Sequence, residues 1–195
     1  KTCVGHLRPV LGDYIRALIV HLDPDHASVC NNAAWALGEI AVQIRGDMNV
    51  FAGEIMNKIL PMLLDPDRHL NLLENLAITI GRLGLFCPEI VSQPLPTFSK
   101  NLCLALRKIR NDTEKEHAYR GLCALIRANP KGVLDTFAFV CDAIVSYQNP
   151  PAELKLEFQQ IFRGFKQSMP EQSWNQFLAG LPQQLQYDLR RDYQV

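Results

Sequence analysis

The chain has 195 residues, 48% of them hydrophobic and 21% charged, which is ordinary for a folded domain with a sizeable core. Lysine plus arginine and aspartate plus glutamate both number 20, so the net charge is zero. This balance argues against nucleic acid as the main partner, because counterion-driven binding needs a basic face. No apolar run reaches the roughly 18 residues of a membrane-spanning helix, so no membrane is expected as a partner.

The first residues, Lys1–Val4, include no start methionine and do not form a signal peptide. We therefore expect a fragment or a processed piece of a longer protein.

Six cysteines are scattered among apolar neighbours, and none belongs to a Cys-x-x-Cys pair. This pattern predicts buried free thiols, no disulfides and a reducing, intracellular compartment. His26 and Cys30 are spaced to share a metal ion on one helix face, but no third ligand is near in sequence. We expect no metal site and no cofactor.

Helical periodicity, interrupted by proline, glycine and aspartate, runs through the whole chain, and strand signals are almost absent. The fold class is therefore predicted to be all-α. The expected helices are 6–21, 28–46, 49–64, 69–86, 90–110, 113–128, 131–147, 151–167, 170–179 and 182–193. Thr113 and Glu116 have the spacing of a capping box for one of them.

Two patterns recur after about 42 residues. The turn Leu22–Asp25 returns as Leu64–Asp67, and the small-residue motif of Asn32–Gly38 returns as Asn75–Gly81, 43 positions later. A period near 42 with two helices per unit predicts a right-handed α-solenoid of HEAT repeats, in which small residues let neighbouring helices approach closely. We expect one solenoid over 1–195, with units at 1–47, 48–88, 89–129, 130–167 and 168–195, the last a C-terminal cap that holds Trp174 and Phe177.

The second expected helix carries a tryptophan on its wrong face. Its predicted core-facing positions are Val29, Ala33, Leu37, Ile40 and Ile44. Trp35 lies roughly 150° from the centre of that stripe, where polar residues are expected. Either a neighbouring segment covers the indole or a partner binds it.

The repeat register gives Trp35 an equivalent in each later unit. Ile78 takes its place in the next unit, followed by Arg120 and Arg163. Equivalent helices of a solenoid lie side by side, about 10 Å apart, so Trp35 and Ile78 should be neighbours on one surface. This favours a binding patch, although a covering loop or C-terminal segment remains the alternative. The two arginines, each followed by glycine, would either contact an acidic partner or form an internal ladder.

No catalytic motif is present: there is no Walker loop, dinucleotide glycine fingerprint, zinc-protease helix or nucleophile elbow. The repeated aspartates at Asp23–Asp25 and Asp65–Asp67 follow the repeat, so capping explains them better than catalysis. We therefore expect a protein that is not an enzyme.

Several stretches resemble transportins, the karyopherin-β2 nuclear import receptors, in their C-terminal part. These stretches are Asn31–Ile40, Leu72–Gly84, Arg110–Glu116, Tyr119–Cys123, Asn129–Val133 and Leu189–Val195. The resemblance covers essentially the whole chain. It implies a receptor module that binds proline-tyrosine-type nuclear localisation signals of cargo proteins on its concave face. It also implies Ran control, mainly through an N-terminal part outside this chain, contacts with phenylalanine-glycine nucleoporins, and shuttling between cytoplasm and nucleus.

The resemblance also assigns residues to the cargo groove. Trp35 and Ile78 match positions that contact the apolar or basic N-terminal part of the signal, and Asn31 and Asn75 lie in the same groove. From its charge, Glu74 is expected to attract a basic residue of the peptide.

Two positions depart from the family pattern, because Ala27 replaces an isoleucine and His69 replaces a proline. A smaller, wetter pocket would follow. The alternative function is a HEAT-repeat scaffold, or another karyopherin, that holds protein partners without recognising a signal peptide. The scaffold predicts that protein covers Trp35, whereas the receptor predicts an accessible indole.

Overall fold

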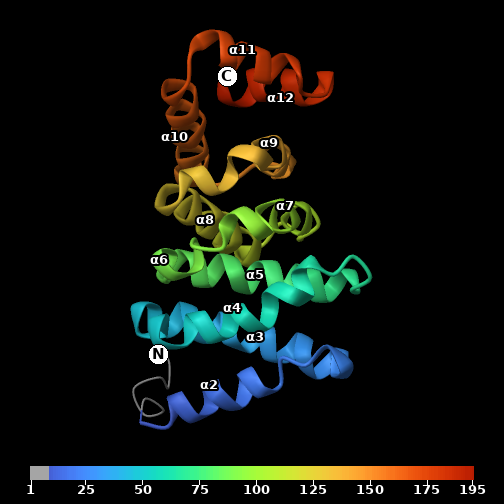
Figure 1. The fold of residues 1–195 in the computed structure, drawn as a ribbon, viewed down its shortest axis with the longest axis vertical. Coiled ribbons are helices and arrows are strands. Elements are labelled where there is room, and N and C mark those ends of the chain that lie inside the picture. The colour runs from blue at the N-terminus through green and yellow to red at the C-terminus, as the bar shows by residue number, and fades with distance from the viewer. Residues whose placement is uncertain (1–8) are drawn as a thin grey trace.

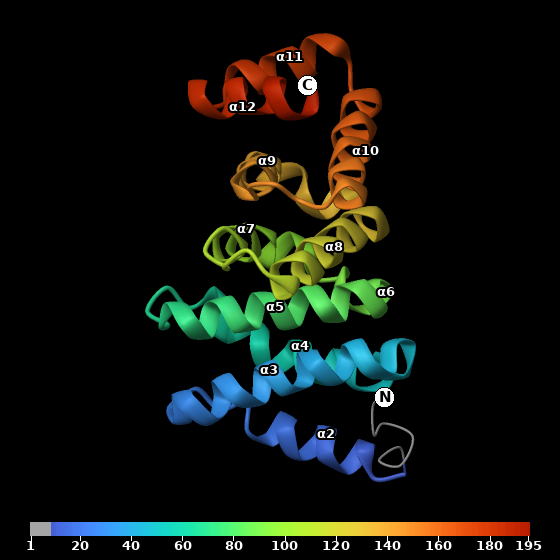
Figure 2. The same ribbon diagram turned by 180° about the vertical axis from the view of Figure 1, so that it is seen from behind.

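A computed structural model describes residues 9–195. Figures 1 and 2 show helices stacked along the long axis, with α2 (Leu11–Val20) at one end and α11 (Glu171–Ala179) and α12 (Gln183–Tyr193) at the other. The described part of the chain contains helices and no strands. The predicted all-α solenoid of helix pairs is confirmed.

The helices form two layers along the stack. One layer, here the B layer, contains α3 (Ala27–Ile44), α5 (Leu70–Phe86), α8 (Thr113–Ala128) and α10 (Ala152–Ser168), each in contact with the next. Their first residues are 43, 43 and 39 positions apart, which is the period seen in the sequence.

The other layer, here the A layer, contains α2, α4 (Asn49–Leu64), α7 (Leu95–Leu106) and α9 (Phe137–Ser146), again in successive contact. Helix α12 packs against α9 and α10 at the end of the stack. Short helices complete the path: η1 (Pro24–His26), η2 (Arg45–Met48), α6 (Pro88–Val91) and η3 (Pro130–Thr136). The division into five HEAT units stays a prediction.

The turns before α3 and α5 repeat one hydrogen bond. The Asp23 carboxylate accepts from the backbone N–H of Asp25, and Asp65 accepts from Asp67, both at 3.0 Å. The predicted capping box of Thr113 is wrong, because Asp112 caps α8. Its carboxylate accepts from the N–H groups of Glu114 and Lys115 at 2.9 and 3.0 Å, which satisfies two amides that the helix leaves unpaired.

Three helices differ in extent from their predictions. The segment 90–110 is two helices, α6 and α7, separated by a turn that ends at Pro94, which has no N–H to continue a helix. The segment 131–147 begins with η3. Helix α2 begins at Leu11, and the part of its prediction at 6–8 lies outside the described residues, as does Cys3.

The predicted core stripe of α3 is partly wrong. Val29 is 47% exposed, and Ile40 and Ile44 are only half-buried. The buried positions are Cys30, Ala33, Ala34, Leu37, Gly38 and Ala41. Helix α3 packs against α2 on one side and α5 on another, so its small residues are the ones enclosed. A core stripe predicted from the large apolar residues misses these small buried positions.

Helix α5 is the most enclosed helix of the B layer. All of its residues from Leu76 to Gly84 are buried, because α3 and α8 pack against two of its sides. The closest approach is to α8, where a Cβ atom built on Gly121 would overlap the carbonyl of Gly81. The predicted role of Gly81 in close helix approach is confirmed.

The last helices close the stack with aromatic packing. Trp174 is buried, and its ring lies 5.8 Å from that of Phe177 and 6.4 Å from that of Phe137, measured between centroids. The described cysteines are buried free thiols. Among the described helices, none is long and apolar enough to cross a membrane.

Candidate functional site

Trp35 projects from α3 with 45% of its surface exposed. Its indole Nε1–H donates a hydrogen bond to Glu114 Oε1 of α8 at 2.8 Å. Since α5 lies between α3 and α8, this contact crosses the middle helix of the B layer. No described segment buries the indole, so it is available to a partner.

Ile78, the predicted neighbour of Trp35, is only 4% exposed. It does not add an exposed apolar side chain to the surface. It lines a pocket of about 460 Å³, here the polar pocket, formed where α3, α5 and the start of α8 meet. The lining residues are Asn31, Asn71, Glu74, Asn75, Ile78, Ile109, Arg110, Asp112 and Glu114. Four of the seven predicted site residues thus meet in one pocket.

The two predicted asparagines pair with each other. Asn75 Nδ2 donates to Asn31 Oδ1 at 2.8 Å, across the junction of α3 and α5. Within residues 9–195, no hydrogen bond is formed by Asn31 Nδ2 or by Asn75 Oδ1. The pair therefore leaves the Asn31 Nδ2 group free to donate and Asn75 Oδ1 free to accept, and these two functions complement a peptide group.

The polar pocket contains more carboxylates than cations. Glu74, Asp112 and Glu114 line it together with the single cation Arg110. Partial burial raises the pKa of the Glu74 carboxyl, while the charges of Arg110 and Lys108 act in the opposite direction. A cationic group next to Glu74 would offset the cost of burying that carboxylate.

Sequence reasoning missed the ion cluster beneath Trp35. Arg82 of α5 is 3% exposed, and its Nη2 lies 2.6 Å from Glu39 and 3.3 Å from Glu114. Its Nε and Nη1 atoms are buried without a partner. The signal was available in the sequence, because a lone arginine within a long apolar stretch of a helix needs a buried partner.

Comparisons with known proteins show which family this chain belongs to. It is 39% identical over all 195 residues to transportin-1 of Homo sapiens, of which it covers 22%. This chain belongs to the transportin family. It is also 33% identical over 195 residues to transportin of Dictyostelium discoideum, covering 21% of that protein. A match to importin subunit beta-2 of Schizosaccharomyces pombe is 33% identical over 168 residues, covering 83% of this chain and 18% of the relative.

The transportin-family chain thus spans about a fifth of the length of the curated relatives it matches. No family model matches it. The matched stretch is the C-terminal part of a transportin, as its sequence resemblance implied.

Ala27 and His69 lie outside the polar pocket. Ala27 is exposed as the first residue of α3. His69 is exposed as the N-cap of α5, where its Nδ1 accepts from the N–H of Asn71 at 3.3 Å. Both positions therefore lie at helix starts. The structure does not bring them together with the predicted site residues that line the polar pocket, which are Asn31, Glu74, Asn75 and Ile78.

The equivalents of Trp35 in later units differ. Arg120 pairs with Glu116, Glu153 and Glu157 at 2.9, 3.3 and 2.8 Å, linking α8 to α10. Arg163 is exposed, with no ion pair among the described residues. The internal ladder thus holds for Arg120 and not for Arg163.

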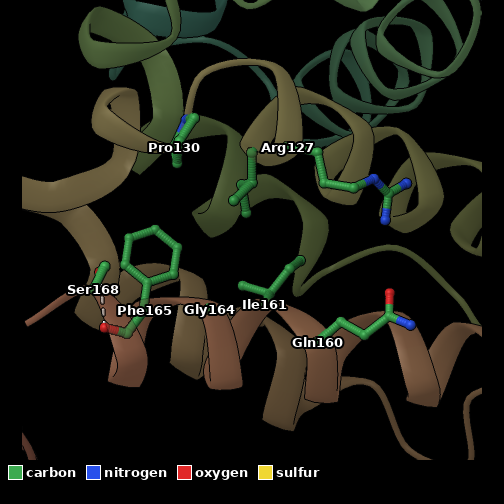
Figure 3. A pocket seen from close by; sticks show the side chains of 8 residues that line it. Arg127, Pro130, Gln160, Ile161, Gly164, Phe165 and Ser168 are labelled. Atoms are coloured by element: carbon green, nitrogen blue, oxygen red, sulfur yellow. Dashed lines mark hydrogen bonds between the residues drawn. The ribbon is translucent and has the colours of Figure 1, made fainter.

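A second, apolar pocket of about 330 Å³ lies between the end of α8 and α10 (Figure 3). Arg127 and Pro130 face Ile161 and Phe165 across it, with Ile126 and Gln160 also in its lining. A Cβ atom built on Gly164 would meet no atom within 4 Å. No group of residues with metal-ligand geometry is found in the described range 9–195.

Proposed function

We propose that this chain is the C-terminal cargo-binding portion of a nuclear import receptor, and that it binds proline-tyrosine-type nuclear localisation signals on the concave, B-layer face. The observation that carries the proposal is the half-exposed Trp35 beside the polar pocket. The receptor carries its cargo through the nuclear pore under Ran control, which acts mainly on an N-terminal part. It contacts phenylalanine-glycine nucleoporins and shuttles between cytoplasm and nucleus.

Each part of the site has a role in this proposal. An apolar side chain of the signal packs on the Trp35 indole. The free donor of Asn31 and the free acceptor of Asn75 bond one peptide group of the extended ligand, and Glu74 receives a basic side chain. Ile78 acts from below, as the apolar floor of the polar pocket.

The departures at Ala27 and His69 alter the edge of this site. Both lie at helix starts with exposed side chains, outside the polar pocket. A short alanine and a polar imidazole leave less apolar surface there than isoleucine and proline would. We expect weaker preference for a large apolar residue in the signal.

The alternative is a HEAT-repeat scaffold, or another karyopherin, that holds partners without recognising signals. It predicts an indole covered by protein. The 45% exposure of Trp35 supports signal binding instead. We propose no enzymatic activity for either function.

Titration of a fluorescently labelled proline-tyrosine signal peptide against the full-length receptor tests the proposal, with and without Ran-GTP. Trp35→Ala should weaken binding by about 2 kcal/mol, roughly 30-fold, as loss of a central interface tryptophan does. Helical content and melting temperature should stay unchanged.

Val29→Ala is the matched control. Val29 lies on the same helix and is 47% exposed, close to the 45% of Trp35, yet it does not line the polar pocket. It should leave peptide affinity unchanged. Equal affinity of Trp35→Ala and the parent protein would reject this site for the signal.

A further inference from the structure

The Trp35 indole is held by a residue from two repeats away. Its only hydrogen bond within the described chain is the one to Glu114 Oε1, 79 positions later in sequence. With 45% of its surface exposed, the side chain is only partly held by packing. Without that bond the ring would be free to exchange between rotamers, at an entropic cost when a ligand selects one.

The Glu114 carboxylate is itself held in place by a buried arginine, Arg82. The same oxygen, Oε1, accepts from Arg82 Nη2 at 3.3 Å. Arg82 is buried to 97% as a residue of the enclosed helix α5, and Glu39 of α3 holds its Nη2 from the other side at 2.6 Å. Charge-assisted bonds of this kind set direction as well as distance. The acceptor for Trp35 therefore has its position determined by the buried cation.

Glu114 also stands where α8 begins. Its backbone N–H donates to the Asp112 cap at 2.9 Å, so the first turn of α8 is ordered. The side chain then reaches back over α5 toward α3. The chain Glu39, Arg82, Glu114 and Trp35 joins three consecutive B-layer helices in one connected set of polar contacts.

We propose that Glu114 is a positioning residue for Trp35. It holds the indole in one orientation beside the polar pocket, so that the ring face is preorganised for an apolar side chain of the bound peptide. The role of Glu114 in peptide affinity rests on the proposed function. The contact between Glu114 and Trp35 does not, and it is observable without any ligand.

The chain has two tryptophans, Trp35 and the buried Trp174, so an amide NMR spectrum of the nitrogen-15-labelled chain contains two indole N–H signals. Trp35→Phe assigns them. Glu114→Ala should shift the Trp35 signal toward that of a solvated indole and leave the Trp174 signal in place. Glu114→Gln, which keeps an acceptor oxygen, should retain most of the hydrogen-bonded shift.

The same substitutions in the full-length receptor are then titrated with the labelled proline-tyrosine signal peptide. Glu114→Ala should weaken binding roughly fivefold, the effect of one hydrogen bond to a charged group at a half-exposed site. Glu114→Gln should weaken it less.

Glu116→Ala is the matched control. Glu116 lies on α8, has the same 30% side-chain exposure as Glu114, and likewise pairs with an arginine, Arg120. Among the described hydrogen bonds, none joins Glu116 to Trp35. Glu116→Ala should change neither the Trp35 signal nor the affinity.

An unshifted Trp35 signal in Glu114→Ala overturns the inference, and so does a shifted signal with unchanged peptide affinity. Failure of Trp35→Ala to weaken binding is a different result: it overturns the proposed function at this site and the positioning role with it. If Glu114→Ala lowers the melting temperature, Glu114→Gln decides, because it keeps the acceptor oxygen: a loss of affinity as large as that of Glu114→Ala, with the Trp35 signal retained, would refute the role.

Discussion

The two junctions on either side of α8 are built differently. Toward α5 the helices touch through backbone, with Gly81, Ala118 and Gly121 at the contact. Toward α10 they are joined by the ion pairs of Arg120 and enclose the apolar pocket. Figures 1 and 2 show the reason: α3 and α5 run across the stack, whereas α10 stands steeply along it.

Residues at equivalent positions of successive repeats therefore need not form equivalent contacts. Arg120 and Gly121 correspond to Arg163 and Gly164, 43 positions later. Gly121 is needed for contact with Gly81, whereas Gly164 faces open space in the apolar pocket. Arg120 is paired three ways, and Arg163 is exposed. The register predicts where a residue lies in its unit, and the angle between units decides what it touches.

The two glycines give the largest expected difference. Gly121→Ala places a methyl group into the backbone of Gly81, which cannot move aside as a flexible side chain would, so we expect a loss of about 3 kcal/mol in unfolding free energy. Gly164→Ala meets no atom and should stabilise α10 by about 0.5–1 kcal/mol. Urea unfolding of both variants measures this, and equal effects would refute the contrast between the junctions.

The arginines of the two junctions should differ by less. Arg82→Met removes a buried cation between Glu39 and Glu114, and we expect a loss of about 2 kcal/mol, because two carboxylates lose their partner. Arg120→Met removes a more exposed cation and should cost about 1 kcal/mol. The loss of unfolding free energy in Arg120→Met should shrink at high salt, whereas the loss in Arg82→Met should persist. Urea titrations at two ionic strengths measure both losses. A reversed order would contradict the idea that the tighter junction depends on its buried charge.

Thiol labelling gives the smallest and most local test. Burial raises the pKa of Cys87, after α5, to about 11, and it also raises the pKa of Cys141 in α9. Neither thiol should react with a disulfide reagent at pH 8 in the native protein, because the thiolate is the reactive form. In urea below the unfolding midpoint, Cys141 should label first, since the units beyond the looser junction open more readily. Simultaneous labelling would mean that the stack opens as one unit.

The raised pKa values of the buried thiols Cys87 and Cys103 predict that the protein loses stability at alkaline pH. In the unfolded chain these thiols ionise near 9.0, while the folded protein keeps Cys87 protonated to about 11 and Cys103 to about 12. Between these pH values the folded state binds more protons than the unfolded state, so stability falls as pH rises. Below pH 8 these thiols are protonated in both states, so they should add no pH dependence to the unfolding free energy.

Much of the fold was determined by local sequence. Helices, their turns at Asp23 and Asp65, and the 43-residue register follow from periodicity and capping, which act over a few residues. The resemblance to transportins, and not the register, placed Asn31 and Asn75 in one groove, because an offset of 43 residues pairs Asn31 with Glu74 and Asn32 with Asn75. The stretches that resemble transportins include the two repeated motifs, Asn32–Gly38 and Asn75–Gly81.

Only the tertiary structure decided which side chains were left for function. It rotated the buried face of α3 onto small residues, buried Ile78, and placed Ala27 and His69 outside the polar pocket. It joined Trp35 to Glu114 across an intervening helix, and no local pattern encodes a contact between residues 79 positions apart. The physical reason is that exposure and pairing depend on the angle and distance between units, which the packing of whole helices sets and a repeat period does not.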